Sequence, residues 1–373
     1  MAWLRVRELV RKEFIQLFRD KKNRPLLFVA PLIQLLLFGY VVSMDIRTIT
    51  VGFLDQSKST ESRRLISAFG ANRTFQVIYS TERPRDIEDR LLRRKLDLAI
   101  KIPPDFAPKI RKGKTTDVQI LADGSMSNMA GVRIAYAGVI IDTFNQSLIK
   151  ELHPFEMTYP RVDERVRTWY NPNLYSQNFF VPGIVAFLIM ILTLLLTSMA
   201  IIKEKEAGTM EQLIVTPIRP FELILGKTIP YIIISLVQMA AVTVFAVFWF
   251  EIPLVGSIVL LFFSSCLFLL STLGIGLFIS TISKTQQQAM MTTFFFLLPF
   301  FMLSGFVFPI ANMPMVVQWL TFLNPLRFFL VVVRGIFLKG VGFSVLWHQL
   351  LAMGIIGVLV FAGAVARFKK RLD

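Results

Sequence analysis

One short segment carries the residues best suited to recognise another protein. It reads Lys203-Glu204-Lys205-Glu206-Ala207-Gly208-Thr209-Met210-Glu211-Gln212-Leu213-Ile214-Val215-Thr216-Pro217. Thr209 and Gln212 have capping-box spacing, which predicts a helix that begins at Met210 and ends before Pro217. Residues 213–215 would form an apolar knob ringed by charge. Such a helix suits docking into a groove of a partner protein; a short amphipathic turn resting on lipid headgroups is the alternative.

Catalytic and metal chemistry lack the necessary residues. The chain has two histidines, His153 and His348, and one cysteine, Cys266, so a multi-histidine metal site is excluded. The sequence contains no phosphate-binding loop of the form G-x-x-x-x-G-K-[ST]. If ATP drives this protein, another chain binds it.

Long stretches without charge dominate the rest of the sequence. Of the 373 residues, 54% are apolar and 18% are charged, and the mean hydropathy is +0.59. About 20 apolar residues are needed to cross the hydrocarbon core as a helix, which excludes a soluble enzyme. We predict six spans: 25–44, 179–202, 228–250, 255–282, 287–308 and 345–366.

The formal net charge of +16 is an orientation signal rather than a sign of nucleic-acid binding. Basic residues gather before the first span and in alternate loops, so the positive-inside rule places both termini in the cytoplasm, including the tail 367–373. In 203–227, by contrast, four basic and four acidic residues cancel. Segment 1–24 is predicted to form an amphipathic helix on the cytoplasmic leaflet, with a basic flanking tail as the alternative. Its expected apolar stripe is Trp3, Val6, Val10, Phe14 and Leu17.

Two segments outside the predicted spans need their own account. Residues 45–178 alternate strand-like and helix-like stretches, beginning with the strand-like Val51–Leu54, and predict an α/β domain with a mixed or parallel sheet. Residues 309–344 are apolar but interrupted by prolines and basic residues, and we expect them to dip into the outer leaflet and return. The predicted fold is therefore an α-helical polytopic membrane protein of six transmembrane helices with an inserted α/β extracytoplasmic domain.

At this point the sequence resembles a known family, the ABC-2 type exporter permeases, and more specifically the bacterial multidrug permeases with a large periplasmic domain between the first two spans. The resemblance runs along essentially the whole chain. Its motifs, besides 203–217, are Arg11-Lys12-Glu13, Ile102-Pro103-Pro104-Asp105-Phe106, Leu121-Ala122-Asp123-Gly124, Trp169-Tyr170-Asn171-Pro172-Asn173, Gly226-Lys227, Leu303-Ser304-Gly305 and Asn324-Pro325.

The resemblance implies a role for each part. Segment 203–227 would hold the coupling helix seated on a separate cytoplasmic ATPase that binds ATP and Mg, and the chain itself would need no cofactor. A second permease, identical or paralogous, a periplasmic adaptor and an outer-membrane channel are the further partners that it implies, in the bacterial inner membrane. The implied ATPase-coupling residues are Lys203, Glu204, Glu206, Gly208, Thr209, Met210, Glu211, Leu213 and Pro217.

Few residues in the sequence point to a transported substrate. Gln34 and Gln238 are uncommon polar residues within spans and are candidates for the translocation path; an interhelical hydrogen bond is the alternative for each. Phe295, in a run of phenylalanines, could bind a hydrophobic drug or face lipid. Arg327 and Arg334 lie two turns apart and could form ion pairs, anchor to headgroups or contact an anionic substrate. A membrane scaffold for an adaptor and a lipid-modifying enzyme remain the competing functions.

Overall fold

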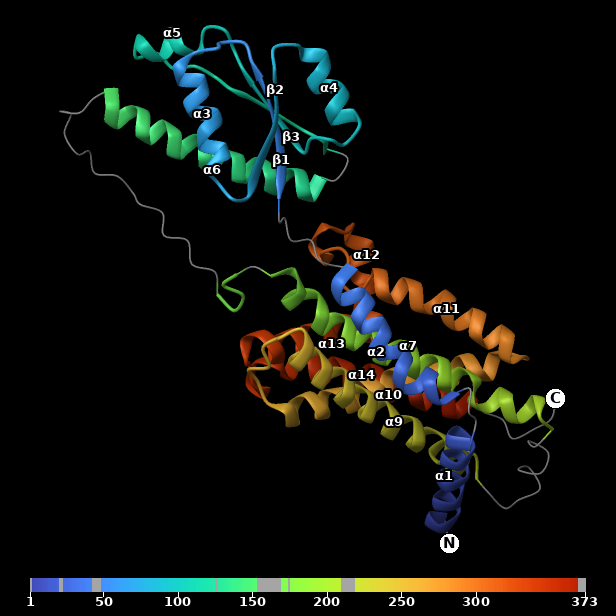
Figure 1. Ribbon diagram of the computed structural model, residues 1–373. Helices are drawn as coiled ribbons and strands as arrows, with labels where there is room; N and C mark the ends of the chain where they lie inside the picture. The colour runs from blue at the N-terminus through green and yellow to red at the C-terminus, as the bar shows by residue number, and fades with distance from the viewer. Residues whose placement is uncertain are drawn as a thin grey trace. The chain divides into compact units, whose positions relative to one another are not determined.

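The computed structural model describes residues 2–19, 23–41, 48–124, 127–152, 169–173, 175–208 and 219–367. The chain divides into two compact units, which we describe separately. The membrane unit comprises Met1–Ser43 and Arg167–Asp373, and the sheet unit comprises Met44–Val166. The elements of both units are drawn in Figure 1.

The sheet unit is built on four strands in the order β2-β1-β3-β4. β1 (Ile49–Asp55) pairs in parallel with β2 (Phe75–Thr81) and with β3 (Leu98–Ile102), whereas β4 (Gln119–Ala122) is antiparallel to β3. Four helices follow the strands in turn: α3 (Thr60–Gly70), α4 (Pro84–Leu92), α5 (Phe106–Arg111) and α6 (Ser127–Leu152). The sheet is mixed and the elements alternate as the sequence predicts.

Alternating side chains along the strands divide the core of the sheet unit into two layers. Val51 and Phe53 on β1 belong to one cluster together with residues of α3, α5 and α6. Leu54, one residue on, belongs to a second cluster with Ile87 of α4. Successive strand residues point to opposite faces of a sheet, so both faces are covered by helices, as Figure 1 shows.

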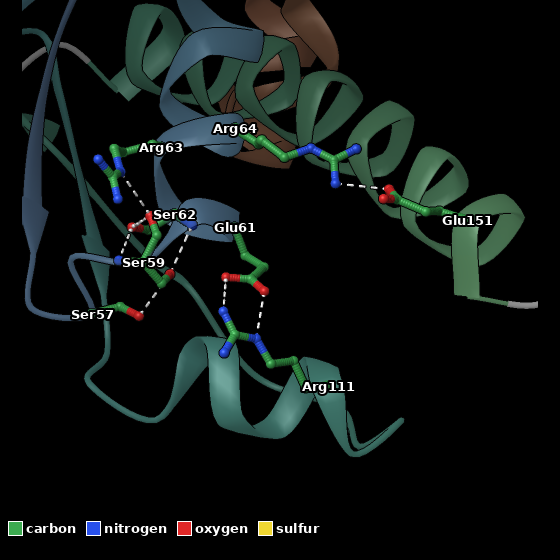
Figure 2. A network of polar contacts seen from close by, with 8 residues as sticks. All are labelled: Ser57, Ser59, Glu61, Ser62, Arg63, Arg64, Arg111 and Glu151. Atoms are coloured by element: carbon green, nitrogen blue, oxygen red, sulfur yellow. Dashed lines mark hydrogen bonds and ion pairs between the residues drawn. The ribbon is translucent and has the colours of Figure 1, made fainter.

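A network of polar contacts surrounds the start of α3 (Figure 2). Ser59 and Ser62 form a reciprocal capping box, and the Ser62 hydroxyl donates to Asp55 at the end of β1 over 2.8 Å. The Arg111 guanidinium on α5 donates two hydrogen bonds, of 2.7 and 3.1 Å, to the Glu61 carboxylate on α3. These hydrogen bonds lower the pKa of the Glu61 carboxyl from its ordinary value of 4.5.

The membrane unit contains four described helices that are long and apolar enough to cross a membrane: α7 (Ser176–Glu206), α9 (Pro220–Trp249), α10 (Ile258–Ile282) and α14 (Phe343–Arg367). They overlap the second, third, fourth and sixth predicted spans, to within three residues at the ends of the third and fourth. α1 (Ala2–Arg19) and α2 (Asn23–Val41) precede them, and Leu27–Val41 of α2 is a shorter apolar helix. α2 falls within three residues of the first predicted span.

The fifth predicted span is too long. α11 (Gln286–Met302) ends six residues before the expected boundary at 308 and is about 25 Å long as an α-helix. Gly305 adopts a φ of +82°, which an L-residue rarely takes, so the chain turns here although no charge marks the end of the helix. This uncharged turn is why the sequence gives no sign of the boundary.

The segment predicted to be re-entrant is a series of short helices. It contains η2 (Ile310–Asn312), α12 (Met315–Leu320), η3 (Thr321–Leu323), α13 (Pro325–Arg334) and η4 (Gly335–Lys339). Residues 315–323 and 325–339 are bent by 82° relative to each other. The Asn324 side chain caps α13 at the bend by accepting from Leu326 N over 3.0 Å. A broken span and a re-entrant loop both have this bend.

α7 lies in the middle of the membrane unit, and small residues let its neighbours approach closely. A Cβ at Gly276 of α10 would collide with Thr197 of α7, and one at Gly274 would come within 2.8 Å of the Phe361 backbone nitrogen on α14. Glycine at such contacts is characteristic of helix packing in membranes. α10 therefore packs closely against both α7 and α14.

The bundle has two chemically different ends. We call one of them the loop end. There α7 ends, α9 and α11 begin, and Arg367 of α14 lies 5.7 Å from the Phe278 ring of α10. At the opposite end, α7 begins, and Trp249 on α9 donates to the Tyr40 hydroxyl on α2 over 3.1 Å. We call this the tryptophan end because four exposed tryptophans lie there: Trp169, Trp249, Trp319 and Trp347.

Candidate functional site

The candidate site is the loop end, where both ends of the predicted coupling segment leave the bundle. α7 is capped by Ala207, and Gly208 follows in the left-handed conformation at φ +71°. Glycine takes this conformation without strain, so it ends the helix sharply. α9 is entered through Arg219, whose backbone NH donates to the Glu222 carboxylate over 3.0 Å. Residues 209–218 join these two points and lie outside the described residues.

Three helices meet in a buried ion cluster at this end. Lys227 Nζ on α9 lies 2.7 Å from Glu13 Oε1 on α1 and 3.3 Å from Glu204 Oε1 on α7. The three side chains are between 4% and 6% exposed. Lys12 also reaches Glu204, at 3.0 Å. Because an uncompensated charge in such a buried position is costly, the cluster ties α1, α7 and α9 together.

The approach of α1 to α9 depends on a glycine next to the lysine. A Cβ at Gly226 would lie 2.6 Å from Leu9 Cβ, so a larger residue would push α1 away. Two contacts extend the ion cluster on either side of this point. The Tyr231 hydroxyl donates to Glu13 Oε2 over 3.4 Å, and Arg5 pairs with Glu222 at 3.3 Å. The Gly226-Lys227 pair thus combines a close approach with a buried charge.

A second carboxylate of α7 holds a different helix. Glu206 accepts a 2.8 Å hydrogen bond from the backbone NH of Gln286 and another from the Gln286 side chain. Gln286 is the first residue of α11, where backbone NH groups lack partners within the helix and a negative charge is favourable. Glu204 and Glu206 are two residues apart and so point about 200° apart around α7. One carboxylate therefore contacts α1 and α9, and the other contacts α11.

The sequence-predicted coupling residues fall into three groups. Glu204, Glu206 and Gly208 make the contacts and the turn just described. Lys203 is exposed on the last turn of α7. The remaining predicted residues, and the helix expected from Met210, lie outside the described residues: Thr209, Met210, Glu211, Leu213 and Pro217.

The three path candidates lie on different helices. Gln34 on α2 is half-buried, and Phe295 on α11 is 73% exposed and packs edge-on against Phe296. Gln238 on α9 is 2% exposed, and both its amide nitrogen and its amide oxygen lack a hydrogen-bond partner among the described residues. The interhelical hydrogen bond considered for Gln238 is therefore not formed within that part of the chain. A shared path remains a prediction.

Sequence reasoning missed the roles of Glu13, Lys227 and Gln286. Of the stripe expected on the leading helix, Val6 and Leu17 are buried and Trp3 is 74% exposed. Leu9 and Glu13, which lie outside that stripe, are also buried. The face of α1 that meets the bundle thus includes a carboxylate that an apolar pattern cannot reveal. The available signals were two motifs quoted with the resemblance, Arg11-Lys12-Glu13 and Gly226-Lys227. The structure brings them together.

The described residues contain no group of three His, Cys, Asp or Glu side chains placed to hold a metal ion. Apolar helices of membrane-spanning length, packed through glycine, define the class of this molecule: it is a multi-pass membrane protein.

The comparisons with known proteins narrow this class to a family. The model of the ABC-2 family transporter proteins matches residues 25–366, so the chain belongs to that family. Two Escherichia coli K12 relatives carry the name probable multidrug ABC transporter permease. YbhR is 31% identical over 365 residues, covering 98% of both chains, and YbhS is 34% identical over 380 residues, covering 100% of this chain and 99% of the relative. The inner membrane transport permease YhhJ is 30% identical over 94% of this chain and 96% of its own.

Proposed function

We propose that this chain is the permease subunit of an ATP-driven exporter in a bacterial inner membrane. ATP and Mg would be bound and used by a separate cytoplasmic ATPase, and this chain would provide the route for a drug-like, hydrophobic or cationic substrate. Membership of the ABC-2 family and full-length similarity to permeases with multidrug names support the proposal. The single observation that carries it is the loop end, because both ends of segment 209–218 are fixed to the helices of the bundle.

The loop end faces the cytoplasm in this proposal, and the sheet unit lies outside. The basic residues of the leading helix and Arg367 at the end of α14 belong to this end, which agrees with the positive-inside rule. Exposed tryptophans at the opposite end fit the other membrane–water interface. Segment 209–218 would then project toward the cytoplasmic ATPase.

The mechanism follows from the contacts of α7 and α9. Closure of the ATPase dimer would push the coupling helix within 209–218. Glu204 and Lys227 are buried against each other and cannot separate without leaving charges unpaired, so α1, α7 and α9 would move together. Glu206 would carry the same displacement to α11 through Gln286. The helices would tilt and open an outward path between two permeases.

Gln238 is the path residue that the contacts support most strongly. A buried amide without a partner costs free energy in an apolar medium, and this cost is relieved if the opening of the path admits water or substrate. We place the second permease, identical or paralogous, across this path. A periplasmic adaptor and an outer-membrane channel would continue the route beyond the inner membrane.

Mild-detergent purification from native membranes tests the proposal. An ATP-binding chain should co-purify with the wild-type permease, and Glu206→Ala should retain that chain but lose export. The matched control is Glu251→Ala, which removes an exposed glutamate at the tryptophan end. Absence of an ATP-binding subunit, or unchanged export in the Glu206 variant, would contradict the proposal. A scaffold would show no ATP-dependent export at all, and a lipid-modifying enzyme would keep its turnover without the ATPase.

A further inference from the structure

The tryptophan end holds basic side chains that have no acidic partner. Arg327, Arg334 and Lys339 lie on α13 and η4, and no ion pair joins them to a carboxylate among the described residues. The sequence itself contains no Asp or Glu from residue 252 to residue 372. A charge in an apolar setting needs compensation, so an anion from outside this chain is the natural partner.

Arg334 is the residue whose surroundings point to such an anion. Its Nε donates to the Phe179 carbonyl oxygen on α7 over 3.3 Å, and its Cζ lies 3.7 Å from the centre of the Phe179 ring. The Phe306 ring lies further off, at 5.8 Å. Nη2 is buried and has no hydrogen-bond partner among the described residues. One edge of the guanidinium is thus positioned by α7, while a donor remains unused.

Arg327, two turns earlier on α13, donates hydrogen bonds to groups of this chain. Its Nη1 donates to the Gln318 carbonyl oxygen over 3.4 Å and to the Thr321 hydroxyl, and its Cζ lies 3.9 Å from the centre of the Phe322 ring. Both arginines lie on α13 and each lies over a phenylalanine ring, but only Arg334 has a buried donor without a partner among the described residues. Arg327 is therefore a matched control for Arg334.

Arg334 is held in place rather than presented on a free surface. The turn after it, η4, is clamped by the loop between α9 and α10: Val255 N donates to Phe337 O over 3.1 Å and Gly256 N to Ile336 O over 2.9 Å. A Cβ at Gly256 would lie 2.7 Å from Ile336 O, so the loop can approach only as glycine. Lys339, at the end of the same turn, lies 5.6 Å from the Tyr170 ring.

The exposed aromatic side chains near this site indicate which kind of anion would bind there. Exposed tryptophan and tyrosine side chains gather at headgroup level in membrane proteins, and Trp169, Tyr170 and Tyr175 lie next to the start of α7 with more than half of their surface exposed. Arginine binds phosphate through parallel N–H donors, which lysine cannot reproduce. We propose that Arg334, assisted by Lys339, binds the phosphate of an anionic phospholipid at the tryptophan end.

Native mass spectrometry of the full chain in mild detergent tests this site. Phosphatidylglycerol is titrated against the wild-type protein and against Arg334→Gln, with Arg327→Gln as the control that removes the same charge from the same helix. We expect Arg334→Gln to weaken phosphatidylglycerol binding roughly tenfold, the effect of losing a charge-assisted hydrogen bond. Arg327→Gln should bind as the wild type does. Equal losses in the two variants, or no loss in either, would overturn the proposal.

Two further arms keep the result interpretable. Arg334→Lys retains the charge and loses the planar fork; it should bind with intermediate affinity, and wild-type affinity would overturn the role of the fork. Inorganic phosphate, added at the lipid concentration, should leave the bound lipid in place because it lacks acyl chains; displacement would assign the site to a soluble anion instead. Thermal unfolding of each variant without lipid reports whether it is folded.

Discussion

The two ends of the membrane unit differ in what lies against their basic side chains. At the loop end, Lys227 lies between Glu13 and Glu204, and Arg5 pairs with Glu222, so basic groups are matched by carboxylates of the same chain. At the tryptophan end, Arg327 and Arg334 lie against aromatic rings and make no ion pair within the described residues.

This difference suits the two ends to different tasks: one end can pass movement between helices, and the other can bind molecules outside the chain. Internally matched charges hold helices in a fixed relation, which is what a segment that passes on a displacement needs. Basic groups without an internal partner are suited to binding something outside the chain. In the proposed mechanism the loop end therefore serves coupling, and the tryptophan end meets the lipid boundary.

The largest loss of stability is expected when the buried carboxylates at the loop end lose a basic partner, because charge is then uncompensated there, as it is at the tryptophan end. Lys227→Met leaves Glu13 buried without its lysine and leaves Glu204 with Lys12 alone, and breaking a buried pair in this way costs about 3–5 kcal/mol. Thermal unfolding in detergent should show a strongly destabilised protein. In the compensated control, Lys227→Met with Glu13→Gln and Glu204→Gln, most of the stability should return. A single variant as stable as the wild type would show that the cluster does not hold the helices.

A smaller loss is expected at the turn that leaves α7. Gly208→Ala places an L-residue at φ +71° and should cost about 1–2 kcal/mol. The control at the other end is Gly342→Ala, where φ is not in the left-handed region and a Cβ meets no atom within 4 Å. Chemical unfolding of the two variants measures the difference. Equal stabilities would mean that the left-handed turn is not required.

Removal of a single carboxylate from each end compares the ends directly. Glu206→Ala removes the acceptor at the start of α11 and should cost about 1 kcal/mol, as loss of a helix cap does. Glu251→Ala removes an exposed glutamate for which no ion pair is formed in the described part of the chain, and it should change stability by a few tenths at most. If the two substitutions destabilise equally, the carboxylates at the two ends are not distinguished by their contacts.

The smallest effect belongs to an exposed pair in the sheet unit, outside both ends. Arg111 lowers the pKa of Glu61, so its stabilisation is present above the ordinary pKa of 4.5 and is lost as the pH falls through the lower folded value. Cleavage rates by pepsin, taken as the ratio of Arg111→Met to wild type, should exceed one near pH 5 and approach one in stronger acid. A ratio independent of pH would contradict the assigned cause. Arg93→Met, which breaks an exposed pair with Asp89, is the control.

Much of the fold follows from local pattern. β1 (Ile49–Asp55) lies where the strand-like Val51–Leu54 predicts a strand, and the long apolar helices lie where the absence of charge predicts them, because these patterns reflect burial. The end of α11 could not be predicted, since Gly305 turns the chain with no change in polarity. Helix rotation was also hidden: the buried face of α1 is decided by the approach of Leu9 to Gly226, which lies far away in the sequence.

The coupling role of segment 203–227 stays a prediction, and the structure adds how the two ends of this segment are held. The cancelling charges of 203–227 suggested a partner surface, yet Glu204 and Glu206 are used inside the bundle. Their partners Glu13, Lys227 and Gln286 belong to other helices, so only tertiary packing reveals the cluster. In the proposed mechanism the two glutamates would transmit movement inside the bundle rather than contact the ATPase.

Transmission from the loop end can be measured directly and without a known substrate. Spin labels are placed at Val237→Cys on α9 and Met291→Cys on α11, two positions that are 51% and 62% exposed, in a Cys266→Ser background. The distance between the labels is recorded in the complete complex before and after trapping with ATP and vanadate. We predict that trapping changes this distance, and that Glu206→Ala abolishes the change while the ATPase still co-purifies and hydrolyses ATP. The same change in the variant and the wild type would contradict the assignment of the loop end to coupling.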